Sequence, residues 1–362
     1  MAKHIIMAVT NDLATDQRVG RTSAALHEAG FAVTLVGRRL KESPRLASRQ
    51  YKCVRMRLLF RRSALFYAND SDTLLACCWA ARLRRKPLAF DAHELFPDVP
   101  ELVGKPAVRR VWRWVESWCL PYVTVAFTVS RPVAEAYGRR YGIVMKVLRN
   151  VPVSSTPLPT TRRVGEKTML LYQGAVNVGR GVRELIDVMN LLPDCRLTVA
   201  GDGDLLDELK AYAAKKPWGG RIEFLGRVTP ERLHKITREA DLGLCLLEEL
   251  GLSYQCALPN RIGDFIHAGV PILATGFEAI REVLEHYGVG TVTEACPHVK
   301  EGQAYEAYIN RLADTISTTL TFWREMPGEE KVRRFAEARR ELCWENEKKI
   351  LLEAVDAKFK RD

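Results

Sequence analysis

The chain has 362 residues, 47% hydrophobic and 27% charged, which is the composition of a soluble globular protein long enough for two domains. Its nine cysteines are scattered without a Cys-x-x-Cys pair, so they support neither a zinc site nor a disulfide framework. No apolar stretch approaches the ~20 residues of a membrane span, and the N-terminal apolar run meets Asn11 and Asp12 too early for a signal peptide. We therefore expect a soluble, reduced, cytoplasmic protein.

The net charge of +11 is unevenly distributed. Residues 1–150 hold 26 Lys and Arg against 12 Asp and Glu, a net charge of +14, while residues 151–362 hold 29 against 32, a net charge of −3. A basic half indicates an anionic partner, such as a lipid surface, an anionic substrate or nucleic acid. The alternative is a solvated basic face that serves solubility.

Apolar runs rich in β-branched residues predict strands in the first half at 5–9, 32–36 and 123–129. Between the first two, the segment from Asp16 to Gly30 has apolar residues at roughly helical spacing and ends in glycine. Strand, helix and strand at this spacing predict a right-handed βαβ unit on a parallel sheet.

The same pattern restarts after Asn150-Val151-Pro152 and a polar stretch. The predicted strands there are 169–172, 196–200, 222–224 and 242–247, and the predicted helices are 182–192, 205–214 and 230–240. We therefore predict two doubly wound parallel α/β domains, residues 1–152 and 153–328. The charged tail, residues 329–362, is predicted as a helix that packs back across the linker.

Loops at the carboxyl ends of parallel strands are the candidate binding sites. The first, Thr10-Asn11-Asp12, is polar rather than glycine-rich, so it is no dinucleotide fingerprint. Gly174–Gly181 (Gly-Ala-Val-Asn-Val-Gly-Arg-Gly) lacks the Lys-Ser/Thr ending of a P-loop, yet it places glycines and Arg180 at a helix start that favours phosphate. The turn 201–204 also follows a strand and is interpreted as an ordinary strand-to-helix turn.

A predicted helix between Pro259 and Gly269 places a cation and a carboxylate one turn apart. Pro259 favours a helix start, Arg261 follows in the first turn, and Asp264 lies three residues on. Arg261 and the helix N-terminus suit a diphosphate, and Asp264 suits a ribose hydroxyl pair. The alternative is an ion pair within the helix, worth only about 0.2–0.5 kcal/mol.

Three segments in this order resemble glycosyltransferase family 4: Asp91-Ala-His-Glu-Leu-Phe-Pro97, Gln173–Gly181 and Ala257-Leu-Pro-Asn-Arg-Ile-Gly-Asp-Phe-Ile-His-Ala-Gly-Val-Pro271. The resemblance implies the GT-B fold, two Rossmann-like domains facing a cleft. It also implies a retaining enzyme that moves a sugar from a nucleoside-diphosphate sugar to a polysaccharide or lipid-linked acceptor in bacterial envelope glycan synthesis. No cofactor and no metal are implied, since basic side chains and helix termini neutralise the diphosphate.

The resemblance also assigns roles to individual residues. His93 matches a histidine near the transferred sugar, Arg180 and Arg261 match cations at the donor diphosphate, and Asp264 matches an acid that binds ribose. The other residues implied are Gly174, Asn177, Gly181 and Asn260 on the donor side, and Asn11, Asp12, Arg18 and Glu94 on the acceptor side.

Two features depart from the family pattern. The first acid of the family's Glu-x7-Glu motif falls at Cys256, so the sugar of the donor cannot be named. Similar sequences also carry another helix and strand before the stretch that matches Asn69–Thr73. Only about ten residues separate Leu59 from that stretch, too few for a βαβ crossover. We therefore expect that the N-terminal sheet lacks one strand.

Arginine and tryptophan alternate over residues 108–121. On a helix they would form an aromatic stripe beside Arg109, Arg110 and Arg113, which suits an anionic membrane surface, as would the nearby Arg55, Arg57, Arg61 and Arg62. The alternative is an ordinary core helix. Two other functions stay open, a nucleotide-sugar 2-epimerase of the same fold and a catalytically impaired GT-B binding protein. No helix-turn-helix or single-strand stacking motif supports nucleic acid.

Overall fold

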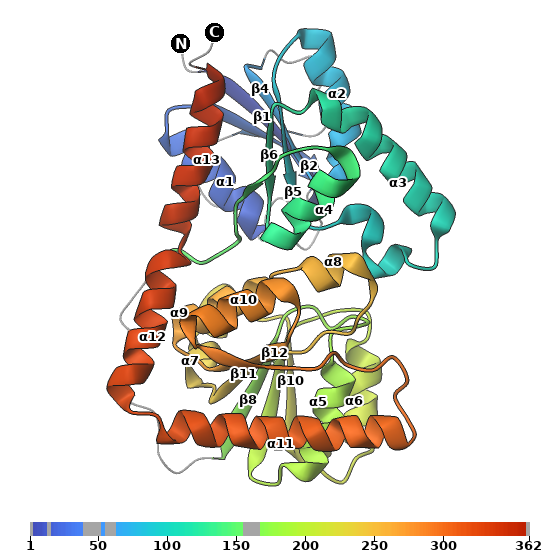
Figure 1. Cartoon of the computed structure of the whole chain (residues 1–362), viewed down its shortest axis with the longest axis vertical. Coiled ribbons are helices and arrows are strands. Elements are labelled where there is room, and N and C mark those ends of the chain that lie inside the picture. The colour runs from blue at the N-terminus through green and yellow to red at the C-terminus, as the bar shows by residue number, and fades with distance from the viewer. Residues whose placement is uncertain (1–2, 13–15, 39–51, 55–62, 155–166, 360–362) are drawn as a thin grey trace. The chain divides into compact units, whose positions relative to one another are not determined.

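The computed structural model describes residues 3–12, 16–38, 52–54, 63–154 and 167–359. The chain divides into two compact units (Figure 1). Unit 1 comprises Met1–Asn150 together with Trp344–Asp362, and unit 2 comprises Val151–Cys343. Each unit is a doubly wound parallel sheet covered by helices, which is the predicted α/β class.

Unit 1 contains a seven-stranded sheet in the order β3-β2-β1-β4-β5-β6-β7, in which every pairing is parallel. Its strands are β1 (His4–Asp12), β2 (Ala32–Arg38), β3 (Lys52–Val54), β4 (Leu65–Asn69), β5 (Leu88–Ala92), β6 (Val125–Thr128) and β7 (Lys146–Val147). β4 and β5 are buried along their whole length. Such strands read as continuous apolar runs because helices cover both faces of a parallel sheet.

The helices of unit 1 begin where local signals place them. Asp16 and Ser130 cap α1 and α4 by accepting hydrogen bonds from the backbone N–H groups of Val19 and Val133. The helices are α1 (Gln17–Glu28), α2 (Ser71–Arg84), α3 (Pro106–Cys119), α4 (Arg131–Tyr141) and α13 (Trp344–Phe359), with short 3-10 turns at Phe96–Asp98, Pro100–Leu102 and Leu120–Tyr122.

The sheet of unit 1 contains seven described strands, and β1 pairs directly with β2 on one side and with β4 on the other. The short spacing noted in the sequence lies between β3, which ends at Val54, and β4, which begins at Leu65. The connection from β3 to β4 runs largely through residues 55–62, outside the described residues.

Unit 2 contains a six-stranded parallel sheet in the order β10-β9-β8-β11-β12-β13. Its strands are β8 (Thr168–Gln173), β9 (Cys195–Ala200), β10 (Ile222–Gly226), β11 (Leu242–Cys245), β12 (Ile272–Thr275) and β13 (Gly290–Thr293). The four strands predicted here are confirmed, although β11 ends two residues earlier than expected. The last two predicted residues, Leu246 and Leu247, lie beyond the strand but are fully buried. The apolar run in the sequence therefore continues past the end of β11.

The helices of unit 2 are α5 (Val182–Val188), α6 (Leu206–Ala214), α7 (Pro230–Glu239), α8 (Gly251–Cys256), α9 (Asn260–Ala268), α10 (Glu278–Tyr287), α11 (Gln303–Glu325) and α12 (Gly328–Glu341), with short 3-10 turns at Met189–Leu191 and Gly219–Arg221. Helix α9 matches the prediction, with Pro259 at its N-cap and Gly269 at its C-cap. Gly269 has a φ of 71°, a left-handed conformation that glycine adopts without strain.

The charged tail was predicted as one helix and is two. α12 ends before Leu342, and α13 begins at Trp344. The first belongs to unit 2, where Phe335 and Ala338 join the core, whereas the second belongs to unit 1. Leu351 and Val355 of α13 are fully buried among strands of unit 1. The apolar spacing of the tail is helical on both sides of the break, so the sequence pattern could not show where the chain changes unit.

Candidate functional site

Each sheet reverses its strand order at one point, and polar side chains gather there. In unit 1 this point lies between β1 and β4, and in unit 2 it lies between β8 and β11. Open α/β sheets bind ligands outside the carboxyl ends of the strands at such a switch point. Each unit therefore has one candidate site, set by its topology.

In unit 2 the first element of the site is the buried cation Arg261. It lies in the first turn of α9, is 6% exposed, and its guanidinium stacks on the ring of Tyr172 at 4.5 Å. Its Nη1 atom has no hydrogen-bond partner among the residues that the structure describes. A Cβ added at Gly174 would lie 3.2 Å from its Nη2 atom, so glycine leaves the guanidinium room beside the end of β8.

Arg180 provides a second guanidinium in the same place. It stacks on the ring of Tyr254 at 4.4 Å, and its buried Nε atom also lacks a hydrogen-bond partner within the described part of the chain. Burial raises the pKa of the Cys245 thiol at the end of β11, and the positive charges of Arg261 and Arg180 each lower it. The two cations therefore converge on the end of one strand.

The glycine loop that carries Arg180 is held against the turn after β9. The Asn177 Oδ1 atom accepts the backbone N–H of Asp204 at 3.1 Å, and the N–H of Val176 donates to Asp202 at 3.0 Å. A Cβ added at Gly201 would lie 1.8 Å from the carbonyl oxygen of Gly174. The turn 201–204 thus supports the loop by close backbone contact, beyond its predicted role as a plain connection.

The predicted ribose residue Asp264 is partly exposed on α9, one turn beyond Arg261. Its Oδ2 atom accepts a hydrogen bond from the Gln173 side chain at 3.0 Å, and Gln173 in turn accepts from Thr237. These contacts fix the orientation of the carboxylate at the end of β8. Asn260 is exposed at the start of the same helix, and Cys256 is buried at the end of α8.

Sequence reasoning missed a buried charge cluster beside the same loop. Lys300 forms ion pairs with Glu184 of α5 and with Glu248, which follows β11. His298 contacts Glu248 at 3.2 Å, and the backbone N–H of Glu248 donates to the carbonyl of Gly179. No motif signalled this cluster, because Glu184, Glu248 and Lys300 lie more than fifty residues from one another and only the fold brings them together.

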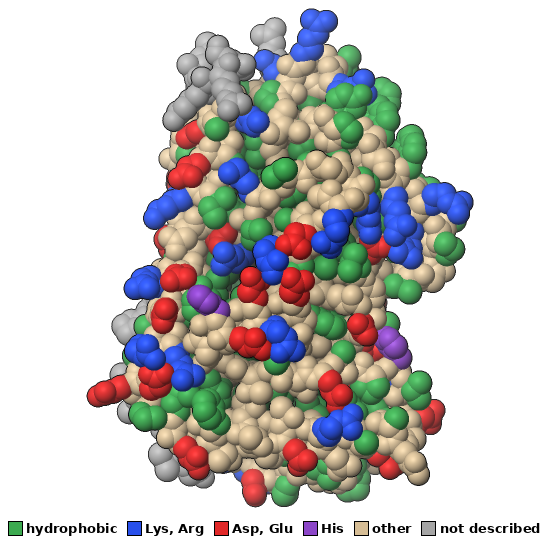
Figure 2. Space-filling model, viewed as in Figure 1, with side chains coloured by type: hydrophobic (Ala, Val, Ile, Leu, Met, Phe, Trp, Pro, Cys, Tyr) green, Lys and Arg blue, Asp and Glu red, His purple; other side chains and the backbone are tan. Residues whose placement is uncertain are grey.

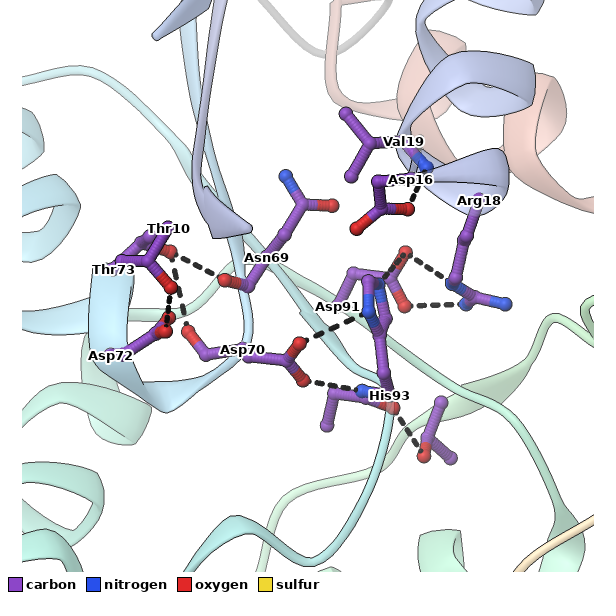
Figure 3. A network of polar contacts seen from close by, with 12 residues as sticks. Thr10, Asp16, Arg18, Val19, Asn69, Asp70, Asp72, Thr73, Asp91 and His93 are labelled. Carbon is purple, nitrogen blue, oxygen red and sulfur yellow. Dashed lines mark hydrogen bonds and ion pairs between the residues drawn. The ribbon is translucent and has the colours of Figure 1, made fainter. Parts of the chain in front are cut away.

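In unit 1 the site is a network of charged side chains around His93 (Figure 3). Its Nδ1 atom lies 3.0 Å from Oδ2 of Asp70, and its Nε2 atom lies 3.7 Å from Oδ2 of Asp91. The backbone N–H of His93 donates to Oδ1 of Asp70 at 2.8 Å. Burial alone would lower the pKa of His93, but Asp70 and Asp91 outweigh it and raise the pKa to about 10. His93 is therefore a fixed imidazolium at neutral pH.

Asp70 and Asp72 complete the network from the start of α2. Asp70 has a φ of 61°, which is strained for a residue other than glycine, and such strain gathers at functional sites. Asp72 accepts a hydrogen bond from Thr10 at the end of β1. Burial raises the pKa of Asp72, against the lowering effect of that bond.

Sequence comparison assigns a family to the C-terminal part. Residues 159–314 match the model of the family described as glycosyl transferases group 1. The chain is a glycosyltransferase. A comparison with curated proteins found no match.

Comparison with solved structures agrees on the fold over nearly the whole glycosyltransferase. HepE of Anabaena in complex with UDP has a TM-score of 0.71 at 15% identity, covering 98% of this chain and 100% of that one. Sucrose-phosphate synthase of Thermosynechococcus elongatus has a TM-score of 0.73 at 16% identity, covering 99% and 100%. The lipopolysaccharide outer core galactosyltransferase WaaB has a TM-score of 0.69 at 12% identity, covering 98% and 99%. These similarities confirm the predicted GT-B fold.

Among the predicted acceptor-side residues of the glycosyltransferase, Arg18 lies in the interior of unit 1. It is 3% exposed, and its guanidinium donates to Asp91 and to the carbonyl of Leu148. It therefore holds Asp91 in place inside unit 1. Glu94 is partly exposed directly after His93, and the side chains of Asn11 and Asp12 lie outside the described residues.

Across the described part of the glycosyltransferase, no three His, Cys, Asp or Glu side chains converge as a metal-binding group. No helix in that part combines the length and the apolar character needed to cross a bilayer.

Proposed function

We propose that this glycosyltransferase uses a nucleoside-diphosphate sugar and transfers the sugar, with retention, to a polysaccharide or lipid-linked acceptor of envelope glycan synthesis. HepE binds UDP and UDP-glucose in solved structures, and WaaB is a galactosyltransferase of the lipopolysaccharide outer core. These proteins share the fold of this chain, which supports the proposal for the donor and for the class of acceptor.

The observation that carries the proposal is the pair of guanidinium groups in unit 2 that each keep an N–H group without a partner among the described residues. A buried charged donor without a partner costs stability, and it binds an anion of matching geometry strongly when one arrives. Arg261 and Arg180 each rest on a tyrosine ring, and the charge of each lowers the pKa of the buried Cys245 thiol at the end of β11. A diphosphate carries the charge and the acceptor oxygens that both groups lack.

In the proposed reaction the bond between the sugar and the diphosphate breaks, and negative charge develops on the leaving diphosphate. Arg180 and Arg261 stabilise that charge, as fixed donors in a site shielded from water do. Asp264 orients the nucleoside by accepting hydrogen bonds from ribose hydroxyls. His93, held as an imidazolium by Asp70 and Asp91, stabilises charge near the transferred sugar rather than accepting a proton.

The proposed donor site is completed by Gly174, Asn177, Gly181 and Asn260 around the two arginines. Because two arginines supply positive charge, the proposal requires neither a cofactor nor a metal ion. We expect transfer to continue in EDTA. Activity that disappears in EDTA and returns with manganese would contradict this part of the proposal.

The proposal also places the enzyme on the cytoplasmic side of the membrane, where its basic N-terminal half meets lipid-linked acceptors. The net charge of +14 over residues 1–150 supports this placement.

Arg261→Met tests the donor site through two measurements of opposite sign. Removing an unpartnered buried charge should raise the melting temperature of the nucleotide-free protein. The same change should weaken UDP or GDP binding by roughly ten- to a hundred-fold, since a hydrogen bond to a charged group contributes about 1.5–3 kcal/mol. Calorimetric titration and thermal unfolding of one preparation provide both values.

Lys235→Gln, which removes an exposed cation of α7, is the control for a general change in charge. It should leave both measurements unchanged. A variant at Arg261 that binds both nucleotides as tightly as the original protein would exclude this arginine from the donor site.

A further inference from the structure

Half of the exposed large hydrophobic side chains in the described chain lie in one stretch of unit 1. Fourteen such side chains are exposed in the described residues, and seven lie between Trp79 and Tyr122. They are Trp79, Leu83, Val103, Val108, Val111, Trp114 and Tyr122. Large exposed apolar patches mark interaction surfaces more often than isolated exposed residues do.

Helix α3 has two apolar stripes rather than one. Val115 and Cys119 are buried and face the interior of unit 1. On another side, Ala107, Val111, Trp114 and Trp118 follow each other at intervals of four, three and four residues, which places them along one face of a helix. Val111 and Trp114 of this second stripe are 58% and 59% exposed, so the core of the unit does not account for it.

Helix α2 continues this surface. Ala76, Trp79 and Leu83 are exposed at helical spacing, Trp79 at 58% and Leu83 at 72%. The rings of Trp79 and Trp118 lie 5.5 Å apart, which joins the stripe of α2 to that of α3. The guanidinium of Arg82 lies 4.1 Å above the ring of Tyr122 and 5.1 Å above that of Trp118. We call Ala76, Trp79, Leu83, Ala107, Val111, Trp114 and Trp118 the α2–α3 surface.

The rim of the α2–α3 surface is mostly positive. Residues 79–122 are all described, and their exposed cations are Arg82, Arg85, Lys86, Lys105, Arg110 and Arg113. Their one exposed acid is Glu101, because Asp91, Asp98 and Glu116 are buried against partners of their own and Glu94 is partly buried. Figure 2 shows Lys and Arg side chains gathered over the region of α3.

This charge pattern selects among the possible occupants. A second copy of the chain packed on the same surface would bring two sets of these cations together, and like charges across an interface are repulsive. Anionic phospholipid headgroups complement the cations, and the interfacial region accepts tryptophan and aliphatic side chains beside them.

We propose that the α2–α3 surface binds to an anionic phospholipid bilayer, with Trp79, Val111 and Trp114 in the headgroup region and the surrounding Lys and Arg on lipid phosphates. The inference rests on the proposed function in one respect, since docking would give the enzyme access to a lipid-linked acceptor. Trp112 of the same helix does not join this surface, because it packs edge-on against Phe96 and is partly buried.

Vesicle flotation of the full chain tests the proposal. We expect binding to phosphatidylglycerol vesicles and little binding to phosphatidylcholine vesicles at low salt. Lys105→Gln with Arg110→Gln should weaken binding on the order of twenty-fold at low salt, about five-fold for each cation. Val111→Ser with Trp114→Ser should remove the binding that persists at high salt, together with the quenching of tryptophan fluorescence by brominated lipid.

The matched control is Lys235→Gln with Phe322→Ser, which removes an exposed cation and an exposed aromatic ring of unit 2. It should bind vesicles like the original protein. Near-ultraviolet circular dichroism and UDP titration of every variant establish that the fold and the donor site are intact. Weak UDP binding in the original protein would contradict the proposed function without affecting the vesicle result.

Three outcomes would overturn the inference. They are equal recovery with both lipids or with neither, unchanged vesicle binding of both double variants, and a dimer in light scattering that the Val111 and Trp114 changes abolish. The last would assign the α2–α3 surface to a second copy of the chain.

Discussion

Arg18 and Arg261 are both buried, but the groups that surround their side chains differ. Arg18 is 3% exposed and Arg261 is 6% exposed, so both guanidinium groups are removed from water. Arg18 forms two hydrogen bonds to Asp91 and a third to Leu148, so its charge is compensated within the protein. Arg261 rests on an aromatic ring and keeps one nitrogen without a partner among the described residues. Only the second has unused capacity for an anion.

Asp264→Ala tests the role of the neighbouring carboxylate. Loss of a charge-assisted hydrogen bond to ribose, about 1.5–3 kcal/mol, should weaken UDP or GDP binding by roughly ten- to a hundred-fold. Asp264→Asn separates this effect from loss of the Gln173 contact, because the amide oxygen still accepts that hydrogen bond. Calorimetric titration of both variants should show weak binding in each. Full affinity in the Asn variant would leave Asp264 with a structural role only.

His93 predicts a distinctive dependence of stability on pH. Its folded pKa of about 10 lies above the ordinary value of 6.5, so the ion pairs with Asp70 and Asp91 stabilise the fold fully below pH 6.5. This contribution is lost as the pH rises from 6.5 through 10. His93→Gln should therefore destabilise the protein most near pH 6 and progressively less toward pH 10, as measured by urea unfolding. A constant difference over that range would show that His93 is not held as a cation.

The same residue predicts a kinetic effect. Because His93 lies in unit 1 and the two arginines of the proposed donor site lie in unit 2, His93→Ala should lower kcat and leave nucleotide affinity unchanged. Steady-state rates of sugar transfer measure kcat, and UDP titration measures nucleotide affinity. If the His93→Ala variant kept the kcat of the original protein, the role that the resemblance implies for His93 would be wrong.

At the scale of elements, the glycine loop that carries Arg180 depends on backbone contact between two turns. Gly201 approaches Gly174 so closely that a methyl group would lie 1.8 Å from the Gly174 carbonyl oxygen. Gly201→Ala should destabilise unit 2 by about 1–3 kcal/mol and weaken nucleotide binding, because the loop carrying Arg180 must move. Gly220→Ala is the matched control, since nothing lies within 4 Å of the added atom. Equal melting temperatures for the two variants would contradict this role of the turn.

Helix α3 also shows how one element combines two functions. Its buried side holds Glu116, which accepts hydrogen bonds from Ser71, Tyr137 and Tyr141. Its other apolar stripe remains exposed beside basic side chains. The buried hydrogen bonds of Glu116 hold α3 in position, while the other apolar stripe does not pack against the core of unit 1.

At the scale of the whole molecule, the last helix belongs to the first unit. Leu351 is fully buried in the core that α13 shares with strands of unit 1. Leu351→Ala should destabilise unit 1 by about 2–5 kcal/mol, because the deletion leaves a cavity. Hydrogen exchange should then accelerate in β1 and β4 and stay unchanged in β8 and β9. Leu352→Ala, at a partly buried neighbour, should have a smaller effect. Faster exchange in both units would contradict the division.

Local patterns in the sequence determined the class of fold and most elements of the glycosyltransferase. Strands buried on both faces appear as continuous apolar runs, and helix ends carry signals such as Asp16, Pro259 and Gly269, so β1, β8, α1 and α9 could be predicted. Arg180, Arg261 and His93 could be proposed as site residues because they lie next to those elements in short motifs. The short strand β3 and the break between α12 and α13 could not, because neither carries a distinctive local pattern.

Only the tertiary structure decided what each charged side chain does. Arg18 and Arg261 look equivalent in the sequence, and the difference between them arises from Asp91, which lies more than seventy residues from Arg18. The cluster of Glu184, Glu248 and Lys300, and the surface that joins Trp79 to Trp118, likewise unite residues from separate elements. Periodicity and motifs report neighbours along the chain, whereas burial and charge compensation depend on neighbours in space, which the order of the strands brings together.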